Sequence, residues 1–295
     1  MSWSVVHRRR DGPARASAAS LAAVQVAELV RSRELLVNLT LRELRGRYKR
    51  SVLGWGWSLL NPLASMTIYS LVFRFILKVR FPAGSPSGLK AYGVCLLCGL
   101  LSWNFFALTT GASMGALIGN ASLIKKAAFR REAVVLATVG AQLMTFLIEL
   151  GLLSVVVLAF YRRMILPWLV IALVLVVLLA AFTTGIALIF SGLNVYFRDL
   201  QHLWTLTSQL LFYASPVVYP VSLINDSLKG GRQWLRWVYE ANPIGAFIQS
   251  FRNLLYDFRM PPGGRLAYIV AISFVSLFGG LRVFARLDRR LAEEL

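Results

Sequence analysis

The chain has 295 residues, of which 57% are apolar and only 15% are charged, and its 32 Lys and Arg outnumber 13 Asp and Glu to give a formal charge of +19. Because soluble domains usually carry about a quarter charged residues, this composition excludes a disordered chain and argues against an ordinary soluble enzyme. Two Cys are too few for a disulfide framework. A basic membrane protein fits these numbers.

The first fifty residues are basic and polar. Residues 1–20 are expected to form a basic, flexible N-terminus, and no cleavable signal peptide is predicted because charged residues follow at Glu28 and Arg31. Residues 21–50 predict an amphipathic helix in the cytoplasmic headgroup plane, and the alternative is a helix packed on a soluble domain. The predicted apolar stripe, at helical spacing, consists of Val26, Val30, Val37, Leu41, Leu44 and Tyr48.

Six apolar runs each have about the 20 residues needed to cross the roughly 30 Å hydrocarbon core of a bilayer as a helix. The sequence therefore predicts an all-α polytopic membrane protein with a six-span domain over 54–286 and a cytoplasmic tail over 287–295. The spans are expected at about 54–77, 92–117, 133–161, 165–193, 200–223 and 266–284.

The distribution of basic residues favours cytoplasmic termini. Six spans place both termini on one side, and that side carries 20 Lys and Arg against 11 on the other, with Arg74 inside a span. Cytoplasmic loops of membrane proteins carry such an excess. The charge flanks spans and forms no stripe on a soluble domain, so we predict contact with membrane lipids and no nucleic-acid partner.

Two segments between the spans have patterns of their own. Residues 120–132 are short and basic, and they form either a charged turn that only fixes the topology or a helix that docks onto a partner. Residues 225–258 contain Asn242, which can cap a helix, and Pro243, which suits the first helical position. The apolar residues that follow are too few to span a bilayer. We expect re-entrant or interfacial helices between spans five and six.

The sequence contains no recognisable catalytic pattern. It has no Walker A loop, no paired Asp residues, no zinc-type His motif and no serine-nucleophile elbow. Cys95 and Cys98 lie in an apolar span, where packing is the expected role. Glu149 is the one acid deep within a span, and a structural hydrogen bond or ion pair is favoured over a proton-coupled role.

Aromatic residues crowd the spans, and this enrichment has two interpretations. Rings near span ends are expected in an interfacial belt, whereas rings turned toward a pore would stack on sugar faces. The sequence does not separate the two. Under the second interpretation, the candidate channel-lining residues are Glu149, Trp57, Tyr69, Phe73, Phe106, Tyr213 and Tyr219.

Four motifs follow one another along the chain. Residues 41–62 contain Tyr-Lys-x-Ser-x-Leu-Gly and then Asn-Pro, and residues 120–132 contain Asn-x-x-Leu-Ile-Lys-Lys and then Phe-Arg-Arg-Glu. Residues 194–199 contain Asn and Arg-Asp, and the last motif joins Ser-Pro at 215–216 to Asn-Pro at 242–243. From about residue 35 to 290 the chain resembles membrane subunits of type 2 ABC polysaccharide exporters, which include permeases for O-antigen, teichoic acid, capsule and mycobacterial galactan. Arg130 stands where that family usually has Pro.

The resemblance implies the type 2 ABC exporter transmembrane fold in a bacterial plasma membrane. It implies a homodimer with two copies of a separate ABC ATPase subunit and a lipid-linked polysaccharide as substrate. ATP and Mg would be used by that ATPase, so this chain would bind no cofactor or metal and would not be an enzyme on its own. The coupling helix and a second cytoplasmic contact would comprise Asn120, Leu123, Lys125, Lys126, Phe129, Arg130, Arg131, Glu132, Arg198 and Asp199.

The N-terminal helix would lie where the lipid-linked glycan reaches the subunit. A pyrophosphate headgroup favours Arg and Lys, although ordinary positive-inside charge explains the same residues equally well. The candidate residues for access of the glycolipid are Arg42, Arg45, Arg47, Lys49 and Arg50.

Three other functions remain open at this stage. An exporter of a drug or lipid would share the fold. An integral-membrane glycosyltransferase would need no ATPase partner, but the missing carboxylate cluster counts against it. A proton-coupled transporter would depend on Glu149.

Overall fold

A computed structural model describes residues 33–48, 51–54, 56–76, 78, 83–126, 130–161, 165–221 and 239–294. Regular structure in these residues is helical, which confirms the all-α prediction. The elements are α2 (Arg33–Tyr48), α3 (Gly56–Ser70), the π-helical η1 (Leu71–Ile76), α4 (Tyr92–Gly119), α5 (Ala121–Lys126), α6 (Glu132–Tyr161), α7 (Leu166–Tyr196), α8 (Leu200–Ala214), α11 (Pro243–Arg252), the π-helical η2 (Asn253–Asp257) and α12 (Gly263–Glu294).

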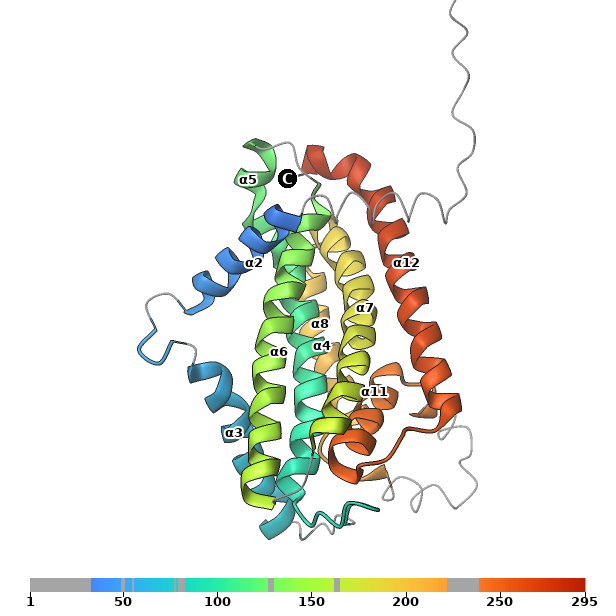
Figure 1. The fold of residues 1–295 in the computed structure, drawn as a ribbon. Coiled ribbons are helices and arrows are strands. Elements are labelled where there is room, and N and C mark those ends of the chain that lie inside the picture. The colour runs from blue at the N-terminus through green and yellow to red at the C-terminus, as the bar shows by residue number, and fades with distance from the viewer. Residues whose placement is uncertain are drawn as a thin grey trace, which may run out of the picture.

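Helix α4 forms the centre of the bundle, with α6 and α7 running beside it (Figure 1). Leu96, Met114 and Leu117 of α4 are fully buried, as expected for a helix that is apolar on all sides. Cys95 and Cys98 are free thiols in this core, which confirms their packing role.

Among the described residues, four helices are long and apolar enough to cross a membrane, namely α4, α6, α7 and α12. Helix α3 continues directly into η1, so the helical run Gly56–Ile76 covers most of the first predicted span. The fifth predicted span is wrong at its end, because α8 stops at Ala214 and not near residue 223. Ser215 has an extended backbone, and Pro216 disfavours helical conformation in the residue before it.

Helices α7 and α12 meet at a pair of glycines. A Cβ on Gly280 would lie 2.3 Å from the Gly185 carbonyl oxygen, and a Cβ on Gly185 would lie 2.1 Å from the Ser276 carbonyl oxygen. Ser276 Oγ also donates to the Phe182 carbonyl across the contact, at 2.7 Å. Small residues allow this close backbone approach in membrane helices.

The two ends of the bundle carry different elements (Figure 1). Helices α2 and α5 and the last turns of α12 gather at one end, called here the α5 end. Helix α11 and the start of α12 lie at the other, called the α11 end. Both ends of the described chain therefore lie at the α5 end, as an even number of crossings requires.

The predicted helix start before α11 is confirmed. Asn242 Oδ1 accepts from the N–H groups of Ile244 and Gly245, at 3.1 and 3.3 Å, and Pro243 occupies the first helical position. Phe247 and Phe251 are fully buried against the bundle. Residues 225–238, the first part of the predicted re-entrant region, lie outside the described residues.

Helix α2 packs on α6 within the chain, which the sequence did not anticipate. The predicted apolar stripe is wrong in part, because Val37 and Leu41 are exposed while Leu39 and Leu44 are buried. The packed face is selected by Gly140 of α6, since Thr40 lies where a Gly140 side chain would be. The N-terminal part of the predicted helix, 21–32, is outside the described residues.

Candidate functional site

Asn120 joins α4 to α5 at the α5 end. Its side-chain N–H donates to the Ala116 carbonyl at 2.9 Å, and its own carbonyl accepts from the backbone N–H groups of Leu123 and Ile124 at 3.0 Å each. The Arg42 guanidinium of α2 donates to Asn120 Oδ1. Through its side chain and its backbone carbonyl, Asn120 therefore connects the N-terminal helix, the central helix and the short basic helix.

A small apolar cluster fills the space between α2, α5 and α6. Leu123 of α5 packs against Leu39 of α2 and against Ala133 and Ala137 of α6. Because α5 is only six residues long, this contact and Asn120 set its position. The predicted coupling segment is thus a short helix held by α2.

The segment after α5 is attached to the end of α12. Arg131 donates to the Asp288 carbonyl oxygen at 2.8 Å and pairs with the Asp288 carboxylate at 2.6 Å. The Tyr196 hydroxyl, at the end of α7, donates to the adjacent Leu287 carbonyl at 3.1 Å. Both contacts fix the C-terminal helix beside the basic segment.

The substitution Arg131→Ala is expected to destabilise the protein by about 1 kcal/mol, and Asp288→Ala by less. Partly exposed ion pairs contribute little, but Arg131 also donates to a backbone carbonyl, which the Asp288→Ala variant keeps. Thermal unfolding of the purified variants would measure the difference, with exposed Lys125→Ala as control. Equal losses for Arg131→Ala and Asp288→Ala would contradict the bond to the carbonyl.

A second exposed feature lies at the turn between α7 and α8. Arg198 and Asp199 are exposed there, and a hollow of about 680 Å³ is lined by this turn and by exposed Phe197. Asn194, one turn earlier, is buried and donates to the Met114 carbonyl of α4 at 2.9 Å. The end of α7 is therefore held in place by Asn194, and the hollow beside it is lined by the Phe197 ring and by the charged side chains of Arg198 and Asp199.

The other predicted coupling residues have different surroundings. Lys125 and Arg130 are exposed, whereas Glu132 is buried in the first turn of α6, where a negative charge suits the helix dipole. Lys126 is the last residue of α5. Phe129 lies outside the described residues.

The described arginines of the predicted glycolipid site share one helix. Arg42, Arg45 and Arg47 are exposed on α2. Arg47 donates to Gln142 Oε1 of α6 at 2.9 Å, in a partly buried position. Lys49 and Arg50 lie outside the described residues. Two of the three described arginines are therefore already engaged by neighbouring helices.

The aromatic residues of α3 and α8 form one cluster with α4. Tyr69 and Phe73 lie 6.4 Å apart by ring centroids, and Phe212 is 6.0 Å from Tyr69 and 5.6 Å from Trp103. Trp57 and Tyr213 are exposed, while Tyr219 donates to the Tyr213 carbonyl at 2.7 Å. A surface with exposed rings therefore lies along α3 and α8.

Phe106 differs from the other proposed lining residues. Its ring is buried between Trp103, Phe182 and Trp204, with centroids 5.7–6.0 Å away. It packs the core of this chain and does not reach an open surface. Glu149 is half-buried on α6, two turns from Gln142, and forms no hydrogen bond or ion pair with the described residues.

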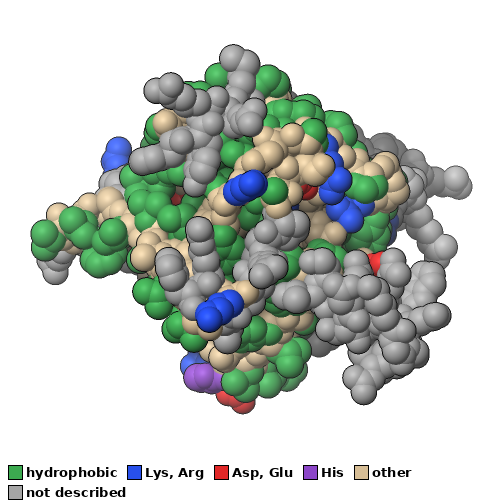
Figure 2. Space-filling view, turned by 90° about the horizontal axis from the view of Figure 1, so that it is seen from below, with side chains coloured by type: hydrophobic (Ala, Val, Ile, Leu, Met, Phe, Trp, Pro, Cys, Tyr) green, Lys and Arg blue, Asp and Glu red, His purple; other side chains and the backbone are tan. Residues whose placement is uncertain are grey.

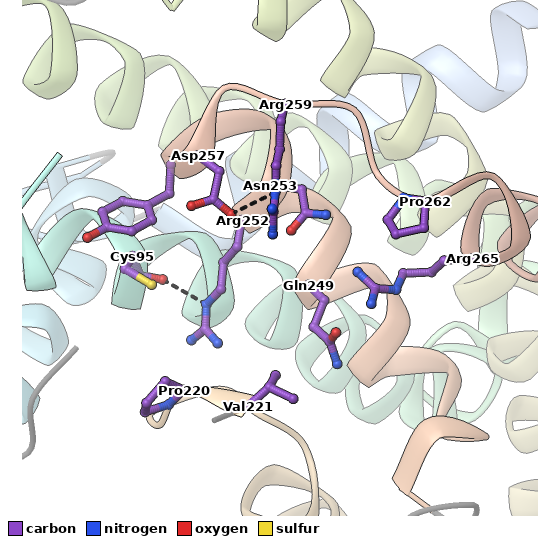
Figure 3. A pocket seen from close by; sticks show the side chains of 11 residues that line it. Cys95, Pro220, Val221, Gln249, Arg252, Asn253, Asp257, Arg259, Pro262 and Arg265 are labelled. Atoms are coloured by element: carbon purple, nitrogen blue, oxygen red, sulfur yellow. Dashed lines mark hydrogen bonds and ion pairs between the residues drawn. The ribbon is translucent and has the colours of Figure 1, made fainter. Parts of the chain in front are cut away.

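A basic pocket at the α11 end was not anticipated from the sequence. It has a volume of about 250 Å³ and is lined by three arginines, Arg252, Arg259 and Arg265, with Asp257 the one acid (Figure 3). Asp257 accepts from the Ser85 N–H at 3.2 Å and pairs with Arg259 at 3.4 Å. Burial raises the pKa of Asp257, and these two partners oppose that shift.

The sequence carried one signal of this pocket. Its arginines belong to the less basic side of the predicted topology, where the charge rule leads us to expect few. Among the described residues no group of three or more His, Cys, Asp or Glu side chains could hold a metal ion. The described features are thus two exposed charged segments at the α5 end, an aromatic face and a basic pocket.

Comparison with known proteins gives matches along nearly the whole chain. The ABC-2 type transporter family matches residues 34–256. The O-antigen export system permease protein RfbA of Klebsiella pneumoniae is 32% identical over 267 residues, covering 89% of this chain and 95% of that protein. RfbA of Myxococcus xanthus is 30% identical over 271 residues, covering 92% and 98%. The polysialic acid transport protein KpsM of Escherichia coli is 24% identical over 254 residues, covering 83% and 90%.

Proposed function

Because this chain belongs to the ABC-2 type transporter family, we propose that it is the permease subunit of an ATP-driven exporter of a lipid-linked polysaccharide. The polymer moves from the cytoplasm across the bacterial plasma membrane. The observation that carries this proposal is similarity to O-antigen export permeases over almost the full length of both chains. The complex contains two copies of this chain and two copies of a separate ATPase, which binds ATP and Mg.

The α5 end supports attachment of that ATPase. Helix α5, with exposed Lys125, and the turn at Arg198 and Asp199 are two charged projections at one end of the bundle. Asn120 and Leu123 connect α5 directly to α2. A displacement of α5 by the ATPase therefore moves α2 as well. This end faces the cytoplasm, together with both termini.

The surface of α8 supports assembly of two copies. Trp204 is the buried anchor of this helix, whereas its exposed side chains mix polar with apolar residues. A helix that faces lipid on all other sides would not expose Gln209 and Thr205 beside Leu206 and Leu210. This mixed face and the rings of α3 line the polymer path between the two copies. Weak stacking of sugar rings on these aromatic side chains suits a polymer that has to slide along the path.

The location of the polymer after loss of the gene tests the function. Deletion in the native bacterium is expected to remove the polysaccharide from the surface while lipid-linked polymer accumulates inside the cell. Fractionated glycolipid extracts and surface labelling measure both pools. Loss of the polymer from both pools would instead indicate a glycosyltransferase. Unchanged polymer would indicate an exporter of another compound.

Two matched variants test whether export of the lipid-linked polymer depends on the predicted coupling segment. Leu123→Asp places a charge in the cluster between α2 and α6 and is expected to leave the polymer inside. Leu123→Met keeps an apolar side chain at the same position in the cluster and is expected to retain export. Membrane abundance of each variant is measured alongside, so that loss of export is compared at equal amounts of protein.

A further inference from the structure

The arginines at the α11 end converge on one space from different segments. Arg252 ends α11, Arg259 follows η2, and Arg265 lies in the first turn of α12 (Figure 3). Viewed from this end, Lys and Arg side chains gather in a patch on a largely apolar and neutral face (Figure 2). The pocket between them has room for several water molecules, each of which occupies about 30 Å³ in the liquid.

Arg252 is a buried cation that forms no ion pair with a carboxylate of the described residues. It is 7% exposed, and it donates to the carbonyl oxygens of Cys95, Val217 and Tyr219 at 3.1, 2.6 and 3.3 Å. A guanidinium has five N–H groups, so two of them have no partner among the described residues. Neutral carbonyls satisfy donors, but they do not cancel the charge.

The neighbouring charges leave the pocket positive. Asp257 pairs with Arg259 and accepts from the Ser85 N–H, so this one carboxylate faces the three arginines of the pocket. An adjoining hollow shares Arg265 and Gln249 and contains Glu240. Counting all of these side chains, three arginines face two carboxylates. A positive site of this kind, with the buried Arg252 at its centre, is stabilised by an anion.

We propose that this pocket binds a phosphate or pyrophosphate oxyanion. Arginine forks match the geometry of phosphate oxygens, and Gln249 and Asn253 add amide donors to the lining. Pro220, Val221 and Pro262 form apolar walls, which would also accommodate the apolar part of a lipid. The phosphate group is therefore either a free anion or part of a lipid headgroup. In the orientation proposed above, the pocket opens on the outer side of the membrane.

The test uses the purified full-length chain in dodecyl maltoside, without its ATPase or any polymer, so its result is independent of the export proposal. Inorganic pyrophosphate is titrated calorimetrically, and dioleoyl phosphatidic acid retained by the protein is counted by native mass spectrometry. The double variant Arg259→Gln, Arg265→Gln is expected to weaken binding at least about tenfold, since hydrogen bonds to charged groups are the strong ones. Lys90→Gln removes an exposed cation outside the pocket and is expected to bind like the wild type.

The outcomes separate the two sources of phosphate. If pyrophosphate displaces retained phosphatidic acid, the site takes a lipid headgroup. If pyrophosphate binds saturably and no phosphatidic acid is retained, the site takes a free anion. Absence of saturable binding of either probe to the wild type overturns the proposal. So does an equal loss in the double variant and in Lys90→Gln. Arg265→Lys, which keeps the charge but loses the fork, is expected to give an intermediate loss and serves if the double variant does not fold.

Discussion

Replacing Gly280 by Leu is expected to leave little folded protein in the membrane. The new side chain would begin 2.3 Å from a backbone oxygen of α7, so the two helices would have to separate. Overpacking commonly costs about 1–3 kcal/mol, and here the obstacle is backbone, which cannot rotate away. Fluorescence-detected size-exclusion chromatography of a tagged chain measures the folded fraction.

Gly279 is the matched control for this substitution. It is the preceding residue on the same helix, and a Cβ there would meet no heavy atom within 4 Å. Gly279→Leu is therefore expected to elute like the wild type. Similar profiles for Gly279→Leu and Gly280→Leu would show that the α7–α12 contact is not as close as described.

Replacing Arg252 by Leu is expected to destabilise the α11 end by several kcal/mol. The change removes the donors for three carbonyls, two of them on the bend after α8 and one on α4. A buried acceptor left without a partner costs about 1–3 kcal/mol. Thermal unfolding in detergent measures the loss, and Arg252→Lys is expected to recover only part of it.

Arg259→Leu is the comparison for that variant. Arg259 lines the same pocket, but its side chain is more than half exposed and pairs only with Asp257. Its loss is expected to cost less than about 1 kcal/mol. If Arg252→Leu and Arg259→Leu had equal unfolding temperatures, the three carbonyl bonds would contribute no stability.

Local rules predicted the elements whose determinants are close in sequence. Asn242 and Pro243 start α11 because a capping amide and a fixed φ act within three residues of the helix start. The spans of α4, α6 and α7 follow from continuous apolar runs of sufficient length. The predicted end of α8 was too late because the apolar run continues past Ser215, whereas the helical backbone ends at Ala214.

Long-range contacts could not be predicted in the same way. Arg252 donates to a carbonyl 157 residues away, and no spacing pattern indicates such a partner. On α2 apolar side chains occur on more than one face, and Gly140 of another helix decides which face packs. Phe106 is a channel-lining candidate by sequence but a core residue in the structure, because the sequence shows an aromatic span residue and not the direction in which its ring points.

The glycine contact has a mechanical consequence. Helices α7 and α12 touch through their backbones at Gly185 and Gly280, so they cannot slide or separate without losing this contact. We expect the two helices to move as one rigid unit. The bond from Arg131 to the Asp288 carbonyl attaches the segment after α5 to this unit. Helices α3 and α8 meet the bundle largely through half-buried side chains, so we expect them to move during a transport cycle together with α2 and α5. We therefore expect α7 and α12 to keep their relative position while the helices around them change theirs.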